Sequence, residues 1–412
     1  MSSTATAVLV TIIALVVAVV AFLIIRRVRY RRALKARGWW FDSKPALETV
    51  LDHQAPPFGL GFVREVDEGV AGGTKAGIPF RVFEYKCTDG GPKFDERVAS
   101  LQLPLALPDL FISTGGVRNG VRFAPVEIDP RLQVRAADRA YAQTVLSPAV
   151  LNAIARFGQA DHPVDLSIDG NHLVAVGAPK DPDQLETYLE ALAPIVEAID
   201  TTAVAPYAVA APASRFGFYD RPDWVYVGRD DSLISGYGLT QVGFGHYTDQ
   251  VVRAGNDGLP IDAFIHHWKT SHTETSTDAN GNTWTRTVPD NHSETVCVLN
   301  MPFAFPLIST DGSWGGKRVK FESEEFNDRY KIKTNSPKFA YDVIHPRTME
   351  FLVAAPPPPF RLEDHQMRFD VSKHDTLLIG YCADFAHSFF ARVPPFVWAN
   401  LGVTPPTFRV TA

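Results

Sequence analysis

A stretch of 22 residues near the amino terminus, 4–25, carries no charge and nothing more polar than threonine (TATAVLVTIIALVVAVVAFLII). A helix rises about 1.5 Å per residue, so this stretch measures about 33 Å and can cross a hydrocarbon core of about 30 Å. A secretory signal peptide has its basic residues first, whereas residues 1–6 carry no charged side chain and the basic residues here follow the apolar stretch. We therefore predict a transmembrane helix at 4–25, preceded by a short end at 1–3.

The apolar stretch is followed at once by a basic cluster: Arg26, Arg27, Arg29, Arg31, Arg32, Lys35 and Arg37. The positive-inside rule predicts a single-pass plasma-membrane protein with its amino terminus outside and its carboxy-terminal body in the cytoplasm. The cluster either fixes orientation and attracts anionic headgroups, at about 1 kcal/mol per basic residue, or forms a specific lipid or nucleic-acid site. Trp39 and Trp40 either join it at the membrane interface or pack onto the first soluble domain.

Composition narrows the class of the remaining chain. The 412 residues carry a formal net charge of −6, and subtracting the seven positive charges of residues 1–37 leaves −13 for the body. An acidic body argues against nucleic acid as a general partner. Its length predicts two or three domains. The three cysteines, Cys87, Cys297 and Cys382, form no C-x-x-C motif, which favours a reducing compartment.

An internal repeat organises this body. Residues 94–108 (FDERVASLQLPLALP) align with 292–306 (HSETVCVLNMPFAFP) at a shift of 198, and the shift holds for about fifty residues. The matched pairs include Pro104 with Pro302, Phe123 with Phe321, Glu127 with Glu325, Arg131 with Arg329, Val145 with Val343 and Pro148 with Pro346. A constant shift with apolar character kept at matching positions predicts a tandem duplication.

The match extends in both directions with other shifts. Upstream, Gly77-Ile-Pro-Phe aligns with Gly258-Leu-Pro-Ile at a shift of 181, so the second copy has 17 extra residues in between. Downstream, 166–177 aligns with 369–380 at a shift of 203. We expect the two copies to share one architecture.

Alternating apolar residues and turn signals predict strands at 61–70, 78–86, 96–103, 110–113, 121–123 and 132–134. We expect Pro104 and Pro108 to end a strand, because proline cannot donate to a central ladder. Residues 138–157 have helical spacing, but Pro148 divides them into two helices or kinks one. A hairpin at 165–176 around Asp169-Gly170 and a helix at 183–199 follow. Each unit is therefore predicted to be α+β, an antiparallel sheet with helices on one side.

These elements divide the chain into five further regions after the predicted transmembrane helix. They are a basic juxtamembrane segment and connector at 26–58, a first repeat at 59–200, an Ala/Pro-rich linker at 201–215, a second repeat at 216–400 that contains an inserted hairpin at 268–288, and a tail at 401–412.

The inserted hairpin is the main difference between the copies. Its two Thr/Ser-rich arms flank Asn280-Gly281, a strong hairpin signal, and few positions are large and apolar. We expect a ribbon that projects from the sheet and is solvated on both faces. Trp268, His272, Asn280 and Trp284 are then candidate contacts for a protein partner. The alternative is a variable surface loop with no binding role.

The sequence contains no common catalytic, cofactor-binding or metal-binding motif. The sequence has no Walker motif, no G-x-S-x-G elbow and no H-E-x-x-H. His266 and His272 would share one face of a strand, but at about 3.3 Å per residue they lie about 20 Å apart and cannot bind one ion. His267 points to the opposite face. We therefore assign no catalytic, cofactor-binding or metal-ligating residue.

The pattern of a strand, Pro104…Pro108, then Phe…Glu…Arg, then Ala142-x-x-Val145-x-x-Pro148, behind a single amino-terminal helix, resembles uncharacterised single-pass proteins of high-GC Gram-positive bacteria. They carry a domain of unknown function, here in tandem. The resemblance covers 61–199 and, more weakly, 243–397; it implies architecture and envelope location and transfers no active site.

The sequence thus favours a membrane-anchored scaffold or adaptor that binds the lipid bilayer and a protein partner, and no nucleic acid. Two alternatives stay open. One is an enzyme with an unrecognised site between the two repeats, and the other is a lipid- or small-molecule-binding protein with an apolar cavity.

Overall fold

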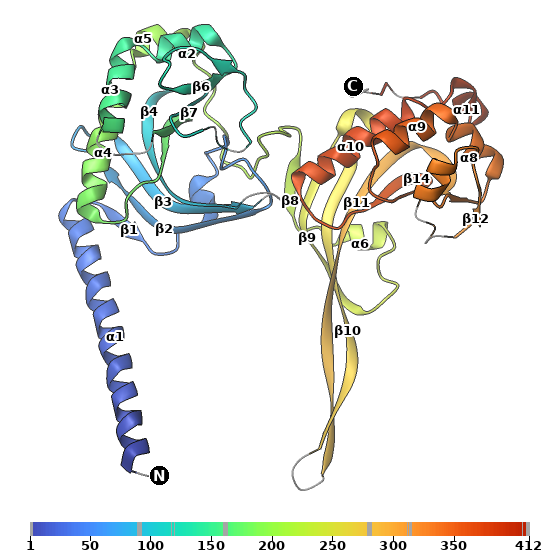
Figure 1. Cartoon of the computed structure of the whole chain (residues 1–412), viewed down its shortest axis with the longest axis horizontal. Helices are drawn as coiled ribbons and strands as arrows, with labels where there is room; N and C mark the ends of the chain where they lie inside the picture. The colour runs from blue at the N-terminus through green and yellow to red at the C-terminus, as the bar shows by residue number, and fades with distance from the viewer. Residues whose placement is uncertain are drawn as a thin grey trace. The chain divides into compact units, whose positions relative to one another are not determined.

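The computed structural model describes residues 3–88, 93–116, 118, 120–159, 164–277, 282–310, 312, 315–405 and 407–408, without the side chains of 3–12 and 14. The chain divides into two units, one formed by 3–88 and 93–219 and the other beginning at Asp220 (Figure 1). Each contains an antiparallel sheet with helices, which confirms the predicted α+β class and is consistent with a duplicated domain.

The first unit begins with one long helix, α1 (Ser3–Ala36), which holds the apolar stretch and most of the basic cluster. The helix ends at Ala36 and is closed by Gly38, whose φ of +74° suits glycine. The Gly38 amide donates to the Lys35 carbonyl and the Trp39 amide to the Leu34 carbonyl. Within the described part of the chain, no helix combines the length and apolar character needed to cross a bilayer. Residues 4–12 and 14 of the predicted span lie outside the described side chains.

The first sheet has the strand order β1-β2-β3-β4-β6-β5, with β7 also paired to β4, and every pairing is antiparallel. The strands are β1 (Trp40–Asp42), β2 (Val63–Gly73), β3 (Pro79–Thr88), β4 (Phe94–Ser113), β5 (Pro125–Val126), β6 (Gln133–Ala136) and β7 (Asp165–Val176). β4 is the longest of these and pairs with β3 along its first half and with β6 at its end.

Helices cover one face of this sheet. They are α2 (Arg139–Val145), α3 (Pro148–Gln159) and α4 (Pro182–Glu197), followed by the short α5 (Thr201–Val204) and the 3-10 turn η2 (Ala205–Tyr207). The main core lies between helices and strands, where Leu189 of α4 and Leu101 of β4 are fully buried. The predicted division of 138–157 is confirmed, because Pro148 begins α3, a position where its missing N–H costs nothing.

The opposite face of the first sheet carries a second, smaller core. Because successive strand residues point to opposite faces, Val82 of β3 joins the main core while Phe83 joins the smaller one. Segment 47–62 covers this face, beginning with the 3-10 turn η1 (Leu47–Val50). Val50 and Phe58 from the segment pack there against Val98 of β4 and Val174 of β7.

Three strand predictions in the first unit were wrong. The expected strands at 96–103 and 110–113 form one strand, β4, which runs through Pro104 and Pro108. Pairing with β3 ends at Leu101, and the register with β7 shifts between Gln102 and Leu107, so the ladder is interrupted around the first proline. The expected hairpin at 165–176 is likewise one strand, β7, with Gly170 at a φ of +56° opposite Leu107. The strand expected at 121–123 lies instead at Pro125–Val126.

The expected linker, 201–215, begins with the helical turns α5 and η2. Val204 is buried in the main core, and the Val209 amide donates to the Ala106 carbonyl of β4. Pro212 lies close to Gly170 of β7. This segment therefore packs on the first unit, which extends to Tyr219.

The second unit repeats the topology with the order β12-β13-β11-β10-β9-β8 and β14 paired to β11. Its strands are β8 (Val225–Gly228), β9 (Phe244–Ala254), β10 (Ile261–Thr277), β11 (Thr283–Ser309), β12 (Lys317–Arg318), β13 (Lys333–Thr334) and β14 (Phe360–Asp370). Its helices are α6 (Ser232–Gly236), η3 (Asn256–Gly258), α7 (Glu324–Arg329), α8 (Pro337–Val343), α9 (Pro346–Ala354), α10 (Thr376–Phe390) and α11 (Pro395–Asn400).

The pairing register corrects one predicted shift between the copies. Val98 of β4 pairs with Val176, and its equivalent Val296 of β11 pairs with Asp370, which gives β7 and β14 a shift of 194. The capping residues of the next helices, Asp181 and Asp375, obey the same shift. The predicted shift of 203 aligned part of strand β7 with helix α10. That alignment arose because both elements contain recurring apolar residues.

A long ribbon extends from the second sheet (Figure 1). β9 pairs with β10 only as far as Lys269, and β14 pairs with β11 only from Val296. Within the described residues, 270–277 and 283–290 therefore pair only with each other. Eight residues at about 3.4 Å each carry the ribbon about 27 Å beyond its neighbours. Asn280-Gly281 lies outside the described residues.

Candidate functional site

A polar cluster lies on the face of the first sheet away from α2, α3 and α4. It is formed by Asp52, His53, Arg81, Ser100 and His172. Alternation along β3, β4 and β7 turns Arg81, Ser100 and His172 to this face, and the loop after η1 brings Asp52 and His53 over them. Tertiary pairing thus gathers residues from four segments of the chain.

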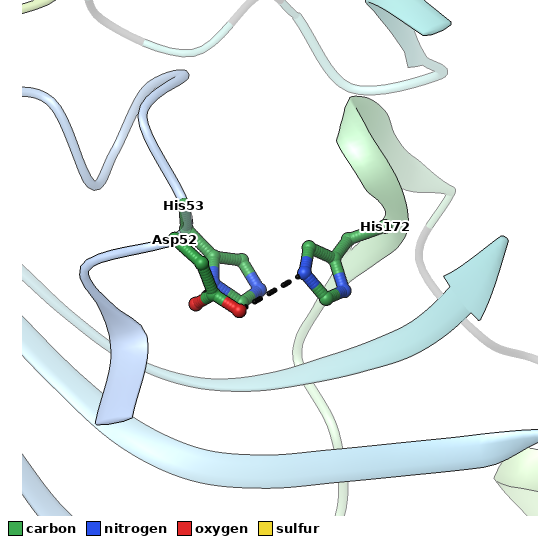
Figure 2. A group of neighbouring side chains, drawn as sticks. All are labelled: Asp52, His53 and His172. Carbon is green, nitrogen blue, oxygen red and sulfur yellow. Dashed lines mark hydrogen bonds and ion pairs between the residues drawn. The ribbon is translucent and has the colours of Figure 1, made fainter. Parts of the chain in front are cut away.

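The centre of the cluster is Asp52, whose carboxylate contacts both histidines (Figure 2). His53 Nδ1 lies 2.9 Å from Asp52 Oδ1, and His172 Nε2 lies 3.2 Å from Asp52 Oδ2. The two imidazole rings stack with centroids 4.4 Å apart and planes 13° apart. One ligand-capable atom from each residue falls within 4.8 Å of the others.

Two further side chains complete the hydrogen bonding. Arg81 Nη2 donates to Asp52 Oδ2 at 2.6 Å and lies 3.4 Å from His172 Nε2. Ser100 Oγ lies 2.9 Å from His53 Nε2. Both carboxylate oxygens of Asp52 and both ring nitrogens of His53 therefore have partners.

Burial and charge set the protonation of the two adjacent residues. Burial by itself would raise the pKa of Asp52, but hydrogen bonds with His172, His53 and Arg81 outweigh it and hold that pKa well below its usual range. Burial lowers the pKa of His53 to about 4, against the opposing hydrogen bond with Asp52. At neutral pH the cluster therefore contains an ionised Asp52 and a neutral His53.

The cluster has the donor types of a transition-metal site. One carboxylate and two imidazoles are a common set of Zn²⁺ ligands in proteins. In such sites the ring nitrogen that does not bind the metal is hydrogen-bonded to another residue, as His53 Nε2 is to Ser100. The Arg81 guanidinium, however, already pairs with Asp52 and lies next to His172. An added divalent cation would have to displace it, so the residues fit a self-contained ion-pair network better than a metal centre.

The chain Ser100, His53, Asp52 also has the connectivity of a nucleophilic relay. A nucleophile must touch its substrate, yet Ser100 is only 2% exposed and lies within β4, paired with Arg81 of β3 and Val174 of β7. The His53 side chain is fully buried. The arrangement therefore does not support acyl transfer.

Adjacent buried polar groups hold the loop that carries Asp52 and His53. The Asp169 carboxylate accepts from the Gln54 amide at 2.9 Å and from the Ala55 amide at 3.0 Å. Burial, reinforced by Asp109, raises the pKa of Asp169 well above its usual value despite these two bonds. Arg118 donates to the Pro56 carbonyl at 3.2 Å. These contacts fix segment 47–62 on the sheet.

The second unit provides an internal comparison. By strand pairing, Asp262 takes the place of Arg81, Val298 that of Ser100, and Gln366 that of His172. Asp262 Oδ2 accepts from the Tyr237 hydroxyl at 2.5 Å and from Asn300 Nδ2 at 3.1 Å. A polar contact thus recurs with the opposite charge and without imidazoles, so the shared fold does not require the histidine pair.

Three of the candidate partner-binding residues, Trp268, His272 and Trp284, are described, and they lie at separate points along the ribbon. Trp268 stacks at the ribbon base between His266 and His292, with centroids 5.0 and 5.4 Å away. His272 pairs with Asp290 at 2.7 Å farther out. Trp284 is 49% exposed near the tip. Asn280 lies outside the described residues.

The histidines near the ribbon base are arranged differently from one another. His266 stacks on His246, whose Nδ1 lies 3.0 Å from His266 Nε2, and it also contacts Glu294 at 3.1 Å. His267 stacks instead on Tyr247, with ring centroids 4.5 Å apart. His246 belongs to β9 and lies 20 residues before His266 in the sequence. The sequence alone did not indicate their contact, because it depends on how β9 pairs with β10.

The predicted membrane-interface residues separate into two environments. Trp39 is 8% exposed and contacts Phe80 with ring centroids 5.1 Å apart, so it packs onto the first unit instead of facing a membrane interface. Trp40 is 67% exposed. Arg37 pairs with Asp183 and with Glu186, which holds the end of α1 against α4.

Sequence reasoning missed the cluster around Asp52. Its members are spread over 120 residues, and their types match no known spacing motif. The available signal was weak: Arg81 and His172 are polar residues at positions that alternate with buried apolar ones in predicted strands.

Comparison with known proteins gives limited information. No protein-family model and no curated protein sequence matches this chain. One solved structure with a partial likeness is the mycobacterial trehalose monomycolate transport factor A, TtfA. The alignment covers 41% of this chain and 92% of TtfA, with 10% sequence identity and a TM-score of 0.31.

Proposed function

We propose that this protein is a membrane-anchored, non-enzymatic scaffold that binds a protein partner through the ribbon of β10 and β11. The observation that carries the proposal is the ribbon itself. Its outer residues, 270–277 and 283–290, lie beyond the strands that flank its base. Its backbone edges are therefore open to an added strand, which is a common mode of peptide recognition.

The side chains of the ribbon suit recognition better than folding. Its outer positions are mostly exposed on both faces, so they contribute little to a core. Trp284 is 49% exposed, and exposed tryptophans are frequent anchors in interfaces. Arg286 pairs with Glu274 across the strands at 2.7 Å, which stiffens the ribbon without burying it.

Membrane anchorage is part of the same proposal and rests on the sequence of 4–25. The described part of this stretch supports it, because the large apolar side chains from Ile13 to Ile25 are each at least 48% exposed. A helix that is apolar on all sides needs an apolar environment. A bilayer provides that environment, with Arg26 and the following basic residues on the cytoplasmic side.

The test is a photo-crosslinking experiment in intact membranes. A photoreactive residue at position 271, an exposed ribbon position outside 273–287, is expected to give a discrete adduct between the full-length protein and its partner. Replacing 273–287 by Asn-Gly joins the paired residues His272 and Val288 and should abolish the contact while leaving the body folded.

A matched pair of point variants tests the aromatic anchor in the same assay. Trp284→Ala should weaken the adduct about tenfold or more, because a hot-spot tryptophan contributes about 2 kcal/mol or more. Phe396→Ala removes an equally exposed aromatic residue from α11 and should have no effect. If the variant with the shortened ribbon still forms the adduct, the scaffold proposal is contradicted. It is also contradicted if the parent protein forms no adduct.

A further inference from the structure

A groove of about 710 Å³ lies between α1 and the rest of the first unit. Leu23, Arg26, Arg27 and Arg29 line it from α1, and Phe41 and Lys180 line it from the opposite side. Glu68, Asp181 and Asp183 also line the groove, which therefore combines an apolar end with charges of both signs. Its volume is in the range of pockets that hold small ligands.

The three arginines of the groove have no counter-ion in the described part of the chain. All three are exposed, and none forms an ion pair there. Other cations nearby are neutralised: Lys180 pairs with Glu68 and with Glu84, and Arg37 pairs with Asp183 and Glu186. Asp181 has no such cation among the described residues, and its carboxylate accepts from the backbone amides of Asp183 and Gln184. The three arginines of α1 outnumber it, so the charge that remains available in the groove is positive.

A buried arginine lies behind the groove wall. Arg97 of β4 is 7% exposed, and its Nε and Nη1 atoms have no hydrogen-bond partner. Its Nη2 donates at 3.4 Å to the hydroxyl of Tyr30, which itself lines the groove. Glu68 and Glu84 lie 3.9 and 3.7 Å from Nη1, beyond hydrogen-bond distance. Arg97 and Lys180 together face Glu68 and Glu84, so this cluster is balanced in charge, and an anion in the groove would be attracted by the arginines of α1.

The position of the groove along α1 indicates where such an anion comes from. If 4–25 spans the hydrocarbon core, Arg26 and Arg29 stand about 1.5 and 6 Å beyond it. The headgroup layer extends about 5–8 Å on each side of the core. Leu23 then remains within the core, so the groove crosses the boundary between acyl chains and headgroups.

We propose that this groove binds the phosphate-bearing headgroup of an anionic phospholipid, with Arg26, Arg27 and Arg29 on the phosphate and the acyl chains directed past Leu23. The proposal rests on the membrane anchorage proposed above. It differs from general attraction of basic residues to a negative leaflet, because only some of the basic residues of α1 line the groove.

The experiment uses the full chain in nanodiscs of phosphatidylcholine with a minor fraction of phosphatidylglycerol. Native mass spectrometry then counts the lipids retained by the released protein. Arg26→Gln with Arg29→Gln is compared with Arg32→Gln with Lys35→Gln, which removes the same charge from residues outside the groove. The first variant should lose retained phosphatidylglycerol about thirtyfold, at about fivefold for each basic contact, and the second less than about twofold. Arg26→Lys with Arg29→Lys should keep most of the binding.

Equal losses in the two charge-matched variants would overturn the proposal, because they indicate general electrostatic attraction. A parent protein that retains phosphatidylcholine as readily as phosphatidylglycerol would overturn it too. Alkaline carbonate extraction of membranes is measured in parallel. If carbonate releases the parent protein from the membrane, the membrane anchor itself is contradicted. If all variants stay in the membrane and retain equal numbers of lipids, only the lipid site is contradicted.

Discussion

His53 is a buried, neutral imidazole in a cluster that also contains an ionised carboxylate and a guanidinium. The cluster attaches segment 47–62 to a sheet face that in the second unit carries different residues. Its chemistry is therefore best tested through stability, with variants that change one charge or one proton-binding group at a time.

Replacing His53 by Gln should remove part of the acid sensitivity of the first unit. The pKa of His53 is lowered to about 4 in the folded chain and is about 6.5 when unfolded, so between these values the unfolded state binds more protons. Stability therefore falls as pH decreases from about 6.5 to about 4, and this residue contributes about 3 kcal/mol of that fall. Chemical denaturation of the full chain in detergent at several pH values measures the difference between parent and variant.

The pH experiment has a matched variant in the other unit. Burial also lowers the pKa of His374 to about 4, so His374→Gln should remove a separate share of the acid sensitivity. If the curve of His53→Gln runs parallel to that of the parent from pH 7 to 4, the assignment of a neutral buried His53 is wrong.

Replacing Arg81 by Gln should convert the cluster into a metal-binding site. Asp52 and the two imidazoles then lack their resident cation, and their donor types suit Zn²⁺. At about 100 times its Kd, Zn²⁺ should stabilise the variant by about 2.7 kcal/mol and leave the parent unchanged. Thermal unfolding with and without Zn²⁺ measures this, with Arg81→Gln plus His172→Ala as the control. Stabilisation of the parent protein by Zn²⁺ would show that Arg81 does not exclude the ion.

At the level of single elements, the ribbon is held at its base by a column of stacked rings. His246, His266, Trp268 and His292 follow one another with centroids between 5.0 and 5.4 Å apart. Gly243 approaches the Trp268 ring so closely that a Cβ there would lie 2.8 Å from it. The base is therefore a packed aromatic contact, whereas the outer ribbon is solvated.

Trp268→Ala should loosen the ribbon without unfolding the unit that carries it. Loss of the stacked contacts costs about 1.4 kcal/mol or more, which corresponds to about tenfold faster local opening. Hydrogen exchange of the amides in 270–277 and 283–290 measures this opening. Trp284→Ala, near the tip, should leave exchange at the base unchanged. A fall in the melting temperature of the whole second unit on Trp268→Ala would place this residue in the core instead.

At the scale of the whole molecule, each unit has its own buried core. Leu189 is fully buried in the first unit and Leu352 in the second. Separate cores of this size predict separate cooperative transitions. The chain is thus expected to unfold as two domains, the first of which begins with the long helix α1.

A pair of core variants tests this independence by calorimetry of the full chain. Leu189→Ala should destabilise the first unit by about 2–5 kcal/mol and shift only one transition. Leu352→Ala should shift only the other by a similar amount. A single transition that both substitutions move equally would show that the units unfold as one.

The sequence predicted the features that depend on neighbouring residues. The long first helix follows from an apolar run with no internal breaker, and the division between α2 and α3 follows from Pro148. The similarity of the two sheet units was predictable because apolar and proline positions recur at a constant shift where no insertion intervenes. The two antiparallel sheets follow from alternating residues in both copies.

Only the tertiary structure decided which distant residues meet. β4 continues through two prolines because its neighbours shift register there, and the shift of 194 between β7 and β14 is defined by pairing with β4 and β11. Asp52 and His172 are 120 residues apart, and strand order brings them within 3.2 Å. Local propensity acts over a few residues, whereas sheet register and the docking of segment 47–62 depend on the whole core. For that reason the long first helix and the two similar sheets were predictable and the buried cluster was not.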